Sequence, residues 1–203
     1  MKKKVITEGI LVIVIVQGLL ILLEQLLSVF FPNTDFFERI ITMISMIILT
    51  VVIILYARKK ETTLSFFSQP FTKLSLIITI ITIIFLVSTP SNYTGGCKAI
   101  LLLIYGSIVT TIFEELLLRG YIWNRFKLIY SDEKKVYIWN VLLFTVWHLG
   151  YMLPQLFAGN WFAVLTKLLA GLGYGIVLGF IRLKSNNCYL TTLVHGILNN
   201  FMI

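Results

Sequence analysis

The chain has 203 residues, of which 58% are hydrophobic, and its mean hydropathy is +0.93. A soluble domain of this length cannot bury so much apolar surface, so the composition excludes a soluble protein and predicts a polytopic membrane protein. The net charge of +8 does not indicate a nucleic-acid-binding protein, because the basic residues cluster between apolar runs.

Seven apolar runs approach the roughly 20 residues that a membrane-spanning helix needs. They cover residues 5–30, 37–56, 71–88, 99–118, 136–153, 161–181 and 188–203. The last run is short, and we expect a tilted or partly buried helix there. The first run is longer than the apolar core of a signal peptide and lacks a small-residue cleavage site, which favours an uncleaved signal anchor. The pattern predicts an all-α bundle of about seven spans.

Lysine and arginine are concentrated in alternate connecting segments. One set carries Lys2, Lys3, Lys4, Arg58, Lys59, Lys60, Lys73, Arg125, Lys127, Lys134, Lys135, Arg182 and Lys184, and the other carries only Arg39 and Lys98. Cytoplasmic loops of membrane proteins are enriched in basic residues. The alternation predicts a multi-pass protein of the cell membrane with its N-terminus in the cytoplasm and its C-terminus outside.

Two adjacent carboxylates stand at the end of the fourth apolar run. Glu115 and Arg119 are four residues apart, so on a helix they are neighbours and can form an ion pair. Glu114 lies about 100° further round the same helix, where it can face a different partner. An ionised carboxylate is costly in a membrane unless it is paired or lies in a water-filled cavity. The alternative is a structural ion pair that marks the end of a helix.

Both histidines of the chain lie inside predicted spans, and each shares a helix face with a companion four residues away. The pairs are Phe144 with His148 and His195 with Asn199. At about 1.5 Å per residue, Glu114, His148 and His195 lie roughly 8–15, 18 and 12 Å below the basic face. The similar depths predict a shared cavity that opens to the cytoplasmic side.

Other intramembrane features have simpler interpretations. Glu24 and Lys167 lie toward the outer side, where long side chains can reach the interface. Glycines at positions 171, 175 and 179 form a small-residue ridge that predicts close helix packing. Cys97 and Cys188 form no metal-binding motif and imply no disulfide framework.

The polar residues support two kinds of hydrolytic chemistry. A carboxylate or imidazole can take a proton from water, and imidazole or carboxamide donors can stabilise an oxyanion. Alternatively, Glu114, His148 and His195 supply the three ligands of a catalytic zinc site, with a fourth position for water. The spacing does not decide between these alternatives, and a divalent metal such as zinc stays a candidate cofactor.

The ordered motifs resemble those of the CPBP intramembrane proteases, also called the CAAX protease and bacteriocin-processing, or Abi, family. The matching motifs are Glu114-Glu115-x-x-x-Arg119, Phe144-x-x-x-His148 and His195-x-x-x-Asn199. The Gly-rich sixth run is similar to a further motif of the family. The resemblance covers residues 99–203, which we interpret as a catalytic bundle of about four spans. Residues 1–98 form about three N-terminal spans that carry no part of it.

The resemblance implies a role for each motif residue. Glu114 is the catalytic acid, which acts as a base toward water together with His148. Glu115 and Arg119 support Glu114.

In the same scheme, His195 and Asn199 stabilise the oxyanion. The short chain is similar to bacterial members, which are associated with bacteriocin processing or self-immunity. The resemblance therefore favours a membrane-associated or bacteriocin-like peptide as substrate over a prenylated protein.

Two further functions remain open at this stage. The first is a non-catalytic bacteriocin immunity or binding protein of the membrane. The second is a small transporter that uses buried carboxylates as proton relays, which the lack of evident inverted repeats disfavours. The expected partners are a peptide or protein substrate and membrane lipid, without nucleic acid. The sequence leaves the oligomeric state open.

Overall fold

The computed structural model describes residues 2–67, 72–89 and 91–200. These residues form helices joined by short loops, with no strand among them. The helices are α1 (Lys2–Ser28), α2 (Asp35–Lys59), α3 (Lys73–Ser88), α4 (Ser91–Thr94), α5 (Cys97–Leu103), α6 (Thr110–Glu115), α7 (Trp123–Lys127), α8 (Glu133–Tyr151), α9 (Leu153–Phe157), α10 (Trp161–Ser185) and α11 (Tyr189–Asn200), with π-helices η1 (Ile104–Val109) and η2 (Leu116–Ile122).

The predicted all-α fold is confirmed, and seven long helical segments correspond to the seven predicted spans. The fourth is the continuous helix from α5 through α7. Four segments, Lys3–Ser28, Asp35–Lys59, Cys97–Lys127 and Trp161–Ser185, are long and apolar enough to cross a membrane. The predicted run ends at positions 71 and 203 lie outside the described residues.

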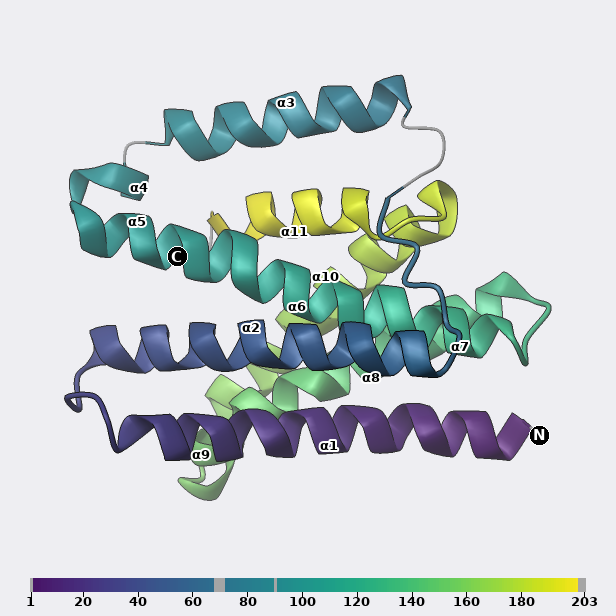
Figure 1. Cartoon of the computed structure of the whole chain (residues 1–203), viewed down its shortest axis with the longest axis horizontal. Helices are drawn as coiled ribbons and strands as arrows, with labels where there is room; N and C mark the ends of the chain where they lie inside the picture. Colours follow the sequence, from purple (N-terminus) through teal and green to yellow (C-terminus); the bar gives the residue numbers. More distant parts are fainter. Residues whose placement is uncertain (1, 68–71, 90, 201–203) are drawn as a thin grey trace.

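The segments pack as a bundle of mostly antiparallel helices (Figure 1). Helix α1 pairs with α2, and α2 also contacts the α5–α7 segment. Helix α8 packs along α10, and α11 contacts α10, η1 and α6. Helix α3 lies at the edge of the bundle against α11 (Figure 1). The fourth segment therefore lies between the N-terminal hairpin and the C-terminal helices, which places its side chains at the centre.

Local signals set the ends of several helices. The side chains of Thr34 and Asp132 accept hydrogen bonds from first-turn amides of α2 and α8. Such N-caps satisfy amides that have no partner within the helix. Asn186 follows α10 with a φ of 56°, in the left-handed conformation that often terminates a helix.

The glycine ridge of α10 packs closely against another helix, as predicted, and the structure shows that this helix is α8. A Cβ added at Gly175 would lie 3.2 Å from the backbone oxygen of Val141. A Cβ at Gly171 would lie 3.0 Å from Nδ1 of His148. Only glycine allows the two backbones to approach this closely without displacing these atoms. The ridge thus brings α10 against the part of α8 that carries a predicted site residue.

The fourth segment contains π-helical turns on both sides of α6. Such wide turns are rare, often occur at functional sites, and alter the hydrogen bonding of the helix. In η2 two buried side chains from other helices bind backbone oxygens. Asn140 donates to the oxygen of Leu118 at 2.7 Å, and Arg182 donates to that of Arg119 at 3.0 Å. The sequence assigned Arg182 to a basic loop, but α10 continues to Ser185 and buries it.

The predicted end of the fourth span at residue 118 is wrong, because the helix continues to Lys127. Arg119 does not mark a membrane interface: its side chain is fully buried and paired. Glu114 therefore lies about 20 Å from the end of this helix at 1.5 Å per residue. It is deeper in the bundle than the sequence predicted.

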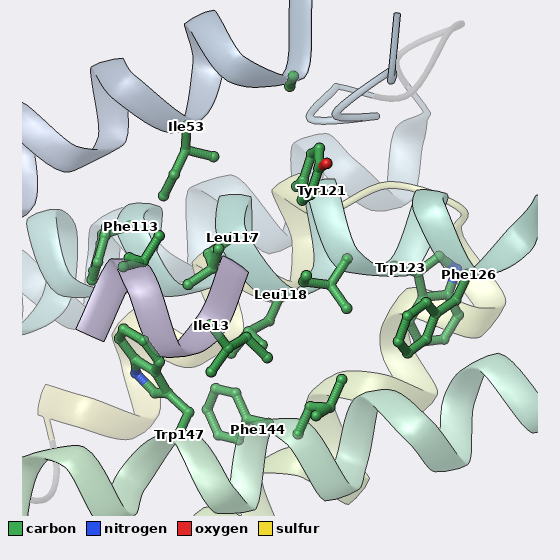
Figure 2. Close-up of a cluster of buried hydrophobic side chains, with 14 of the residues drawn as sticks. Ile13, Ile53, Phe113, Leu117, Leu118, Tyr121, Trp123, Phe126, Phe144 and Trp147 are labelled. Atoms are coloured by element: carbon green, nitrogen blue, oxygen red, sulfur yellow. The ribbon is translucent and has the colours of Figure 1, made fainter. Parts of the chain in front are cut away.

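The core beside this helix is aromatic and aliphatic. Figure 2 shows Phe113, Leu117 and Leu118 of the fourth segment facing Ile13, Ile53, Phe144 and Trp147. Further along the same segment, Tyr121, Trp123 and Phe126 are each 1% exposed or less (Figure 2). This packing fills the half of the bundle nearer the N-terminus and fixes the helix that carries the paired carboxylates.

Candidate active site

The predicted ion pair between Glu115 and Arg119 is present and fully buried. Arg119 Nη1 lies 2.9 Å from Glu115 Oε1, and both side chains are 0% exposed. The guanidinium carbon also lies 3.8 Å from the ring centroid of Phe144. A buried charge is tolerated when it is paired and hydrogen-bonded. The pair therefore forms a fixed support behind the more accessible Glu114.

His195 of α11 is held by the same carboxylate. Its Nδ1 lies 2.9 Å from Glu115 Oε1. A carboxylate only accepts hydrogen bonds, so Nδ1 carries the proton and Nε2 points the other way. Nε2 lies 3.8 Å from Glu114 Oε2. Glu115 thus sets the orientation of an imidazole that faces the second glutamate.

Glu114 is 2% exposed, and its two oxygens have different surroundings. Oε1 accepts hydrogen bonds from Trp147 Nε1 at 3.0 Å and from Tyr151 Oη at 2.9 Å. Oε2 faces His195. Two donors on one oxygen fix the carboxylate plane, which leaves the other oxygen for a different partner.

Trp147 and Tyr151 were not predicted from the sequence as site residues. A signal was present, because Phe144, Trp147, His148 and Tyr151 have the spacing of one helix face. That face turns toward Glu114. The spacing alone does not show which of these side chains carries a donor within reach of the carboxylate.

His148 lies on the same face of α8. Its Nδ1 is 2.8 Å from the backbone oxygen of Phe144. A carbonyl oxygen only accepts, so Nδ1 carries the proton, and Nε2 of the neutral ring is free to accept one. His148 lines the same cavity as Glu114. It is therefore placed to act on a molecule in that cavity.

Asn199 completes the predicted set. Its Nδ2 donates to the backbone oxygen of Gly106, in the first π-helical turn, at 2.8 Å. The amide has a second N–H, and the residue lines the cavity. Gly196 allows α11 to approach this turn, because a Cβ there would lie 2.6 Å from the backbone oxygen of Ser107.

A cavity of about 820 Å³ connects these residues. Glu114, His148, His195 and Asn199 line its inner part, whereas Glu115 and Arg119 are buried behind them. Its outer part is lined by residues that include Glu24, Asp35, Phe36, Arg39, Lys98, Met152 and Lys167. All six predicted site residues thus come together, from the fourth segment, α8 and α11.

The cavity extends toward the end of the bundle opposite the N-terminus. Glu24 lies near the end of α1, Asp35 begins α2 and Lys98 lies in the first turn of α5. Figure 1 shows these helix ends on the side away from the chain's N-terminus. A cytoplasmic N-terminus and a cavity open to the cytoplasm, both predicted from the sequence, are therefore incompatible. If the N-terminus is cytoplasmic, the cavity opens to the outer face.

The donors proposed for zinc do not form a close set of three. Among the described residues, no group of three or more His, Cys, Asp and Glu side chains is arranged to hold a metal ion. Glu114 Oε2 and His195 Nε2 lie 3.8 Å apart. Together with Nε2 of His148, they are the side-chain atoms of the three residues that make no hydrogen bond within the described part of the chain and could bind a metal. The zinc site stays a prediction.

A protein-family model described as "Type II CAAX prenyl endopeptidase Rce1-like" matches residues 96–201. The chain belongs to this family. No curated protein and no solved structure matches this chain. Membership in the Rce1-like family indicates an intramembrane protease that acts on a peptide or protein substrate. The matched region contains all six predicted site residues.

The helices outside the matched region also shape the Rce1-like site. Glu24 of α1 and Asp35, Arg39 and Met46 of α2 line the cavity. Helices α1 and α2 also pack against the matched helices. The division into residues 1–98 and 99–203 stays a prediction.

Proposed function

We propose that this protein hydrolyses a peptide bond inside the membrane, with Glu114 as the base that activates water. One observation carries the proposal: Glu114 is held through Oε1 by two donors, while Oε2 faces His195 beside the cavity. A base must be fixed and must also reach the proton that it removes. Glu114 meets both conditions.

In the proposed reaction, Glu114 takes a proton from water, and the oxygen of that water attacks the carbonyl carbon. His148 orients the same water through Nε2. The new C–O bond converts the carbonyl oxygen to an oxyanion. When the oxyanion collapses, the C–N bond breaks, and the proton held by Glu114 passes to the departing amine.

The oxyanion would be stabilised from α11. Asn199 donates its second amide N–H, and His195 donates from Nε2 in the form of the ring that carries a proton on both nitrogens. Glu115 accepts the hydrogen bond from Nδ1 and so holds this imidazole in place. Donors fixed in place before the reaction stabilise developing charge strongly in a dry site.

The proposed substrate is a membrane-associated or bacteriocin-like peptide, cleaved in processing or self-immunity. A cavity of about 820 Å³ is large enough for a few residues of extended chain. Its walls carry both apolar and charged side chains, which suits a peptide better than a lipid tail.

The test compares peptides from cells that express the wild type or the Glu114→Gln variant. Glutamine preserves size and removes the base, so the rate of product formation is expected to fall about 10²–10⁴-fold. Glu38→Gln is the matched control, because Glu38 is exposed on α2 and lies outside the cavity. His148→Ala and His195→Ala are expected to lose cleavage while the protein remains in the membrane.

The competing function predicts a different result. If Glu114→Gln, His148→Ala and His195→Ala are all stably present and keep both the peptide pattern and the full phenotype, the protein acts without proteolysis. A non-catalytic binding or immunity protein would then be the better description.

A further inference from the structure

Lys167 is a cation within a long apolar helix, and its position on α10 faces the cavity. It shares the cavity wall with Ala170, Gly171 and Tyr174, at the spacing of one helix face. An ionisable residue in a membrane span is costly unless it has a partner or lies in a water-filled space. Lys167 is exposed, and it forms no ion pair with a carboxylate among the described residues.

Two other charged residues of the outer cavity, Arg39 and Glu24, have contacts inside the protein. The guanidinium of Arg39 lies 5.7 Å from the ring centroid of Tyr105. Glu24 accepts a hydrogen bond from Thr42 at 2.7 Å. Lys167 differs from these two residues, because its ammonium group has no such contact in the described part of the chain.

Lys98 also lines the outer cavity and forms no ion pair among the described residues, but it lies 16 residues, or about 24 Å along the helix, from Glu114. Lys167 is therefore the unpaired cation nearer the site, where it can bind an incoming anion.

The distance of Lys167 from the reacting bond follows from the helix geometry. Gly171, one turn further along α10, lies directly against His148. Four residues of helix correspond to about 6 Å, so Lys167 lies that much closer to the mouth. An extended peptide advances about 3.3 Å per residue. An anion bound by Lys167 would therefore lie roughly two peptide residues from the scissile bond. Because the lysine side chain is flexible, the expected separation ranges from about one to about three residues.

We propose that Lys167 binds a carboxylate of the substrate peptide and so selects peptides with a negative charge on the mouth side of the cleaved bond. This inference rests on the proposed peptidase function and names a substrate class for it. The carboxylate can belong to an acidic side chain or to the C-terminus of the peptide. The alternative is a lysine that extends to the membrane interface without contacting substrate.

The experiment measures binding separately from cleavage. The Glu114→Gln protein in lipid nanodiscs is incubated with dodecapeptides that have an apolar first half and a randomised second half. Bound peptides are identified by mass spectrometry. A second mixture with amidated C-termini distinguishes acidic side chains from the terminal carboxylate. The same measurement is made with two double variants, in which Lys167→Gln or Lys184→Gln is combined with Glu114→Gln. Lys184 is the matched control, because it lies on the same helix outside the cavity.

Hydrogen bonds to charged groups are strong enough to give about ten-fold or greater enrichment of carboxylate-containing peptides. We expect Lys167→Gln to abolish this enrichment and Lys184→Gln to retain it. Lys167→Glu is expected to enrich peptides with lysine or arginine instead. Enrichment that is absent, that persists in Lys167→Gln, or that is lost equally in Lys184→Gln overturns the proposal.

The two proposals fail in different ways. If wild type cleaves peptides but neither binding nor cleavage depends on the charge at residue 167, only the role of Lys167 is wrong. If charge selection depends on Lys167 but no cleavage depends on Glu114, the cavity binds anionic peptides and the peptidase proposal is wrong.

Discussion

Removing Arg119 should reveal how strongly the buried ion pair stabilises the site. In Arg119→Gln, Glu115 keeps its contact with His195 but loses the cation at 2.9 Å, in a position with 0% exposure. Removing one partner of a buried pair costs about 3–5 kcal/mol, because the remaining charge has no compensation. The lost contact with the ring of Phe144, at 3.8 Å, acts in the same direction. We expect a decrease of about 3–5 kcal/mol in the free energy of unfolding.

The assay follows tryptophan fluorescence during unfolding of the purified protein by SDS in mixed micelles. Trp147 and Trp123 are buried in the same core and report its opening. The double variant Glu115→Gln with Arg119→Gln removes both charges. Its loss should therefore be smaller than the sum of the two single losses, by about 1–3 kcal/mol. Lys127→Gln breaks an exposed pair with Glu133 and should cost about 1 kcal/mol or less.

Two results would refute this reasoning. One is an Arg119→Gln variant whose unfolding free energy lies within about 1 kcal/mol of wild type, the range of an exposed pair. The other is a double variant whose loss equals the sum of the two single losses. Either result would mean that the charges of residues 115 and 119 are not coupled in the folded protein.

The remaining predictions concern the base, the helix packing, the topology and the metal. Tyr151→Phe removes one donor to Glu114, so kcat/KM for a cleaved peptide should fall about ten-fold or more with the fold retained; an unchanged kcat/KM would exclude a positioning role. Gly175→Leu should lower Tm because α8 lies against that position, whereas Gly173→Leu, where a Cβ meets nothing within 4 Å, should not; equal Tm values would contradict the packing. A membrane-impermeant maleimide should label the exposed Cys97 in intact cells if the cavity opens to the outer face, and labelling only after permeabilisation would place the mouth in the cytoplasm. If the predicted zinc site exists, chelation should abolish cleavage and zinc should restore it; activity in a protein shown to be metal-free would exclude it.

Much of the architecture could be predicted from local patterns along the chain. Apolar runs of span length predicted the seven helical segments, because a membrane helix satisfies its own backbone. The spacing of Glu115 and Arg119 predicted their contact, since both lie on one helix. The glycine ridge predicted a close neighbour for α10. Each inference needed only the periodicity of a single helix.

Contacts between helices could not be predicted in the same way. The donors to Glu114 come from Trp147 and Tyr151, on α8. Which side chains meet depends on how α6, α8 and α11 pack and on the wide turns η1 and η2, which change the hydrogen bonding of the fourth segment. Sequence spacing does not encode those relative positions.

Composition and motif spacing were enough to predict a helical membrane protein and the residues of its candidate site. The packed structure was needed to show that the cavity extends away from the N-terminal end and that Lys167 lines it. The physical reason is that packing fills one half of the bundle, around Tyr121, Trp123 and Phe126, and leaves the other half open. Which half is filled depends on the volumes of side chains from several helices together, and no single segment contains that information.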